Sequence, residues 1–106
     1  MSRNSDALAR IRNLLQLASD TNSRLTAAAI GRHLEHLRVD GYDRDRVAAS
    51  IEAVRDASLR LLIALHGRGD IRHRRAMAIK TTDYLEAILL LVSAPADTPD
   101  EWSVAA

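Results

Sequence analysis

The stretch from Asp43 to His66 constrains the fold most, because its apolar residues repeat at the three-and-four spacing of one helix face. Asp43 is suited to cap the start of this helix, and Gly67 suits a left-handed turn after its end. The second half, Leu59 to Leu65, is apolar on more than one face. We therefore expect a helix that lies centrally or is covered by another chain. Its principal face consists of Val47, Ile51, Val54, Ser58, Leu61, Leu62 and Leu65.

Two amphipathic helices are predicted before this one. The first, capped by Asn4 or Ser5, runs to about Ser19, and the second runs from about Ser23 to Val39. The polar residues from Ser19 to Ser23 tend to bond their own backbone, so we predict a break between the helices. Because no Pro or Gly enforces this break, one long kinked helix is the alternative. Gly31 either marks a close helix–helix approach or is simply tolerated inside the second helix.

A last helix is predicted after the glycine-containing turn that follows His66. Asp70 is suited to cap it, and its apolar face continues to Val92 or Ser93. The sequence Thr81-Thr82-Asp83 is a weak point at which the helix could end and restart. From Ala94 onward two prolines, acidic residues and small residues predict an extended, disordered tail.

Composition supports an all-α fold in a single domain. The chain has 106 residues, too few for two ordinary domains, and it shows no segment with the two-residue alternation of a strand. We predict a bundle of four helices, or five if the last one restarts, over residues 1–93, with residues 94–106 as the tail. No cysteine, signal peptide or bilayer-length apolar run is present, so we expect a cytoplasmic protein without membrane contact.

Residues that could perform catalysis or hold a metal do not form a recognisable motif. His33 and His36 are three apart and could meet one metal ion, but a stable site needs further ligands. No nucleophile elbow or glycine-rich phosphate loop occurs, and Ser58 is explained by a bond to its own helix backbone. We therefore expect no enzyme activity, no cofactor and no metal.

Basic residues cluster between Arg68 and Lys80, whereas the chain after Thr82 carries only acidic residues. This segment suggests a nucleic-acid-binding accessory protein, an acidic protein partner, or simply a solvated helix face. Because the net charge is only +1, we do not favour nucleic acid. The candidate anion-binding residues are Arg68, Arg72, Arg74 and Arg75.

The predicted helices carry more apolar surface than one small core can cover. The excess is greatest from Leu59 to Leu65 and from Leu85 to Val92. Contiguous exposed apolar surface usually marks a protein interface, so we expect a homodimer or a bound partner, unless the other helices cover these two. The residues predicted for a dimer interface are Leu59, Leu62, Ile63, Leu85, Leu89 and Val92.

The first helix is the predicted partner-binding element. It has a single clean apolar stripe, and the polar break after it would make it the easiest helix to detach. Leu8, Ile11 and Leu15 are the expected anchors, with Arg10 and Arg12 as a charged rim. If this helix instead belongs to the core, truncating the same residues would unfold the protein.

A short, cysteine-free, arginine-rich chain of amphipathic helices with surplus leucine faces resembles the QslA-like antiactivators of bacterial quorum sensing. The resemblance lies in size, composition and helix layout along the whole chain. It implies a non-enzymatic protein that binds a LuxR-type transcription factor and blocks its dimerisation or its DNA binding.

Overall fold

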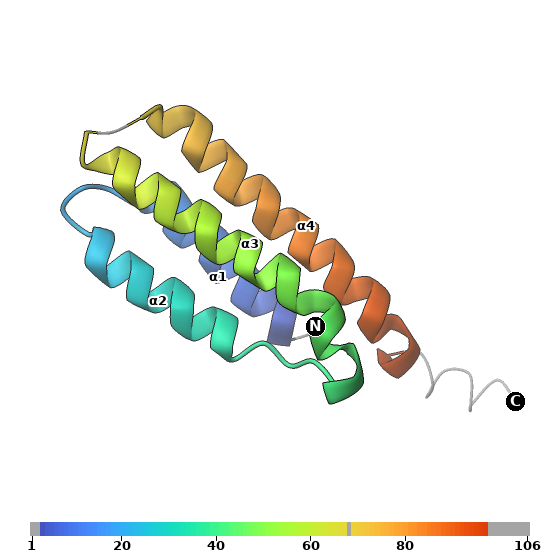
Figure 1. Ribbon diagram of the computed structural model, residues 1–106. Helices are drawn as coiled ribbons and strands as arrows, with labels where there is room; N and C mark the ends of the chain where they lie inside the picture. Colours follow the sequence, from blue (N-terminus) through green and yellow to red (C-terminus); the bar gives the residue numbers. More distant parts are fainter. Residues whose placement is uncertain (1–2, 68, 98–106) are drawn as a thin grey trace, which may run out of the picture.

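The computed structural model describes residues 3–67 and 69–97, which form an antiparallel bundle of four helices (Figure 1). The helices are α1 (Arg3–Leu17), α2 (Ser23–Glu35), α3 (Gly41–Leu65) and α4 (Ile71–Asp97). Each packs against its neighbours in the chain, and α4 also packs against α1, which closes the ring. The prediction of an all-α bundle is confirmed, with four helices rather than five in the described part of the chain.

The core is built from one apolar face of every helix, and not around α3 alone. Val47, Val54 and Leu61 of α3 are fully buried, as the spacing of the stretch predicts. Leu59 and Ile63 remain exposed, because α3 has neighbours on two sides only. The buried apolar residues from the other elements are Leu8, Ile11, Leu15, Ala18, Ile30, Leu34, Leu37, Ala78, Leu85 and Leu89.

The predicted break between α1 and α2 is confirmed, and Asn22 forms it. The Asn22 side-chain oxygen accepts a hydrogen bond from the Ser19 amide at 2.7 Å, and its amide nitrogen donates to the Leu17 carbonyl at 3.0 Å. The Thr26 hydroxyl donates to the same Asn22 oxygen. One side chain thus satisfies backbone groups at the end of α1 and fixes the turn.

The connection from α2 to α3 differs from the prediction. Helix α2 ends at Glu35 rather than near Val39, because Asn4 of α1 binds the backbone of Arg38 through two hydrogen bonds of 2.8 Å. The residue that precedes α3 is Asp40, so the prediction that Asp43 caps this helix is wrong. Asp43 lies in the first turn, and its amide donates to the Asp40 carbonyl at 2.9 Å.

The turn between α3 and α4 follows the prediction. Gly67 has a φ of 98° and Gly69 a φ of 111°, which are conformations that side chains disfavour. The Asp70 carboxylate accepts a hydrogen bond from the His73 amide at 3.1 Å, so Asp70 caps α4 as predicted.

Helix α4 is longer than predicted and unbroken. The Thr81 and Thr82 hydroxyls bond the carbonyls four residues earlier, which lets both threonines remain in the helix. The helix continues to Asp97, four residues into the segment predicted as a tail. Residues 98–106 of that predicted tail lie outside the described residues.

Candidate functional site

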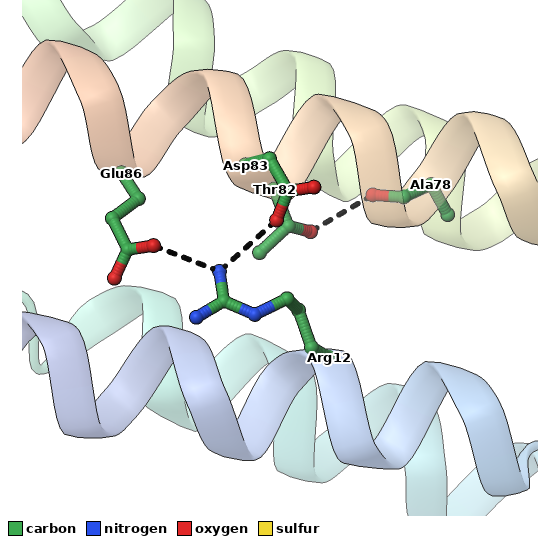
Figure 2. A network of polar contacts seen from close by, with 5 residues as sticks. All are labelled: Arg12, Ala78, Thr82, Asp83 and Glu86. Atoms are coloured by element: carbon green, nitrogen blue, oxygen red, sulfur yellow. Dashed lines mark hydrogen bonds and ion pairs between the residues drawn. The ribbon is translucent and has the colours of Figure 1, made fainter.

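Helix α1 is attached to α4 by a buried apolar face and by Arg12. Its guanidinium Nη1 lies 3.2 Å from Asp83 Oδ1 and 3.1 Å from Glu86 Oε1 (Figure 2). The two carboxylates are three residues apart on α4 and therefore share one face. Arg12 and Glu86 are each largely shielded from solvent, so this ion pair contributes more to stability than a fully exposed pair would.

A second arginine joins the same two helices from the opposite direction. Arg75 of α4 donates hydrogen bonds to the carbonyls of Leu15, Gln16 and Ala18. These carbonyls lie at and just beyond the end of α1, where a helix leaves acceptors without partners and carries partial negative charge. Arg75 thus caps α1 across the bundle and is not available to an external anion.

The predicted partner anchors on α1 belong to the core instead. Leu8, Ile11 and Leu15 each have 0% exposure, so no partner reaches them while the bundle is intact. Of the predicted rim, Arg12 is bound to α4 and Arg10 remains exposed. The clean stripe indicated a well-packed helix rather than a detachable one, and Arg12 and Arg75 hold that helix in place.

A groove of about 760 Å³ runs along the surface between α1 and the first half of α4. Ile71, Ala76 and Ile79 supply its apolar part. Arg72 and Lys80 supply positive charge, and neither forms an ion pair within the described part of the chain. Gln16, Arg75 and Asp83 complete the lining. We call this the α1–α4 groove, and it combines apolar contact with unpaired cations.

The predicted anion-binding arginines do not form one surface. Arg72 and Arg75 line the α1–α4 groove, whereas Arg74 lines a separate hollow between α3 and α4 with His73 and Arg60. Arg68 lies outside the described residues. Because consecutive helical positions point in different directions, a cluster in sequence divides between two sides of α4.

The residues predicted for a dimer interface also divide. Leu62, Leu85 and Leu89 are buried in the core, and Val92 is partly buried against it. Leu59 and Ile63 are exposed on α3. Four of these six residues therefore lie in or against the core, because the bundle covers more of α4 than its apolar circumference implied.

An exposed apolar stripe on α4 was missed in the sequence. Met77, Tyr84 and Leu91 are 43%, 64% and 76% exposed, and they recur at intervals of seven residues. Such spacing places them on one side of the helix, nearly in line. We call these three residues the α4 stripe. The seven-residue interval between these residues could have indicated the stripe. The apolar face that contains Leu85 and Leu89 is the stronger pattern in the same helix, and it points to the core.

Of the four histidines, His66 has a side-chain hydrogen-bond partner within the described residues. His66 Nε2 lies 3.0 Å from Ser23 Oγ and so joins the end of α3 to the start of α2. Burial, aided by the nearby charges of Arg10, Arg32 and His36, lowers the pKa of His33 below its ordinary value. Across residues 3–67 and 69–97, no three potential ligands are gathered in a geometry that could hold a metal ion.

Comparison of the chain with protein-family models, with curated proteins and with solved structures found no match. Within the described ranges, no helix has the length and apolar character required to cross a membrane.

Proposed function

We propose that this protein is a non-enzymatic regulatory protein that binds a protein partner through the α4 stripe. The observation that carries the proposal is the exposure of Met77, Tyr84 and Leu91 at seven-residue intervals on one helix. Exposed large apolar side chains in line on a helix are the usual basis for docking a second helix or filling a groove. The aromatic ring of Tyr84 adds an anchor of the kind that dominates interface energetics.

The stripe replaces α1 as the proposed interface because it is accessible without unfolding. Detaching α1 would expose three fully buried side chains and break the contacts of Arg12 and Arg75. Burial of each leucine or isoleucine side chain contributes about 1.5–3 kcal/mol to the free energy of folding. Detaching α1 would therefore remove most of the stability of a small domain. A partner that binds the α4 stripe avoids that cost.

The resemblance to quorum-sensing antiactivators makes a LuxR-type transcription factor the first partner to test. A helical protein that binds such a factor at its dimerisation surface or near its DNA-binding surface would inhibit it by binding alone, without catalysing a reaction. The α4 stripe supplies the apolar surface that this role requires.

A nucleic-acid-binding role has less support. Arg75 is engaged by carbonyls of α1, and among the described residues Arg72 and Lys80 line one hollow whereas Arg74 lines another on a different side of α4. Affinity for a nucleic acid requires several cations on one surface that contact successive phosphates, and cations on different sides of a helix do not provide this.

The experiment is affinity capture from the native host, followed by mass spectrometry, with three forms of the protein. Leu91→Asp places a charge in the stripe. Leu25→Asp is a matched control, because Leu25 is 77% exposed and Leu91 is 76% exposed, yet Leu25 lies on α2, which is not a neighbour of α4. Both substitutions should leave the fold intact, since neither side chain belongs to the core.

We expect the unmodified protein and Leu25→Asp to capture the same partner, and Leu91→Asp to lose it. Binding of the purified partner should weaken by about 2 kcal/mol or more, as for other interface anchors. Equal capture by all three forms, or loss only with Leu25→Asp, would show that the α4 stripe is not the interface.

A further inference from the structure

The α1–α4 groove presents unpaired positive charge beside apolar side chains. Arg72 and Lys80 are exposed and unpaired within residues 3–67 and 69–97, while Ile71 and Ile79 line the same groove. The only carboxylate in the lining, that of Asp83, is already bound to Arg12. A ligand that fits this groove is therefore acidic and carries an apolar or aromatic side chain.

The chain itself contains a segment with that chemistry. Beyond α4 the sequence continues as Thr-Pro-Asp-Glu-Trp-Ser-Val-Ala-Ala, in which two adjacent acids precede the single Trp of the protein. No Lys or Arg occurs anywhere after Thr82, so nothing in this segment would be repelled by the groove. These nine residues lie outside the described part of the structure.

The segment cannot bring these acids to Arg72 of its own chain. At about 1.5 Å per residue, the part of α4 between Arg72 and Asp97 is about 37 Å long. Asp100 and Glu101 are three and four residues beyond Asp97, and a fully extended chain carries them back by at most about 14 Å. The difference exceeds the combined length of the side chains, so an acidic segment that pairs with Arg72 belongs to another molecule.

We propose that residues 98–106 of a second copy of this chain bind in the α1–α4 groove. In this complex Asp100 and Glu101 pair with Arg72 and Lys80, and Trp102 packs against the apolar part of the groove. Mutual exchange of the segments gives a homodimer with a twofold axis, the most common symmetry for soluble oligomers. The residues of this interface differ from those of the α4 stripe, and the inference does not rest on the proposed function.

The test combines sedimentation with emission of Trp102, which reports on the segment without any label. The full-length chain should pass from monomer to dimer across the micromolar range, and its Trp emission should move to shorter wavelength over the same range. Higher salt should weaken both changes, because the contacts are charged and near the surface.

Two charge-reversed variants make the test specific. Arg72→Glu/Lys80→Glu reverses the groove, and Asp100→Lys/Glu101→Lys reverses the segment. We expect each variant alone to dimerise more weakly by about tenfold or more, and an equimolar mixture to recover dimerisation. Recovery in the mixture also shows that both variants fold.

Several results would overturn the proposal. These are a protein that remains monomeric across this range, a Trp emission shift that does not depend on concentration, or failure of the mixture to recover. Binding of single-stranded or duplex DNA that Arg72→Glu/Lys80→Glu abolishes, with dimerisation unchanged, would instead assign the groove to nucleic acid.

Discussion

Replacing Arg75 tests whether this side chain holds α1 in the bundle. Its guanidinium caps three carbonyls at the end of α1, those of Leu15, Gln16 and Ala18. Hydrogen bonds that involve a charged group contribute about 1.5–3 kcal/mol, and a cation at a helix C-terminus contributes about 0.3–1 kcal/mol. Water can reach some of the freed carbonyls, so we expect Arg75→Met to lower the free energy of unfolding by about 2 kcal/mol.

Urea unfolding followed by circular dichroism measures this loss directly, and the melting temperature should fall by roughly 10 °C for a domain of this size. Methionine retains most of the apolar stem of arginine, which separates lost capping from lost packing. Arg74→Met is the matched control, because the Arg74 side chain lines the hollow between α3 and α4 and donates no hydrogen bond within the described residues, while its backbone amide bonds the Asp70 carbonyl. If both substitutions lowered stability by the same small amount, Arg75 would not be the cap that joins α1 to α4.

Three further predictions concern stability. Gly31→Ala should stabilise the protein by about 0.5–1 kcal/mol in urea unfolding, because a Cβ at Gly31 meets nothing within 4 Å and alanine favours a helix; destabilisation would indicate a close helix approach. Ile11→Ala should destabilise it by about 2–5 kcal/mol, whereas a loss below about 1 kcal/mol would contradict its place in the core. The pKa of His33 is lowered in the folded state, so the unfolded state binds more protons and stability should fall as the pH drops below about 6.5. His33→Gln should reduce that loss in unfolding measured at neutral and at mildly acidic pH, and an unchanged pH dependence would show that His33 does not contribute.

Local patterns in the sequence were sufficient to predict the helices. Apolar periodicity located all four, and the self-bonding residues before Ser23 marked the break that Asn22 makes. Asp70 was identifiable as a cap because its carboxylate acts on an amide three residues away. These interactions are local, so the residues involved lie close together in the sequence.

Two of the errors arose where residues far apart in the sequence decide the outcome. Helix α2 ends early because Asn4 binds the backbone of Arg38, two residues that lie far apart in the chain. The sequence also could not show that the Arg75 side chain reaches the end of α1. Because its guanidinium bonds carbonyls there, Arg75 is not available to the predicted anion site.

The surfaces were harder to predict than the helices. Apolar periodicity identifies Leu8, Ile11 and Leu85 as members of a stripe, but it does not show whether that stripe faces the core or a partner. Their zero exposure follows from ring closure by α1 and α4, a contact between the ends of the sequence. The α4 stripe became visible only when the neighbours of α4 were known.

Hydrogen exchange of the folded protein, with and without its captured partner, tests the central claim most directly. We predict that binding slows exchange of amides along α4 from Met77 to Leu91 and leaves the amides of α1 from Leu8 to Leu15 unchanged. The opposite result, altered exchange in α1 with α4 unchanged, would show that the partner binds a detached first helix and not the exposed face of the intact bundle.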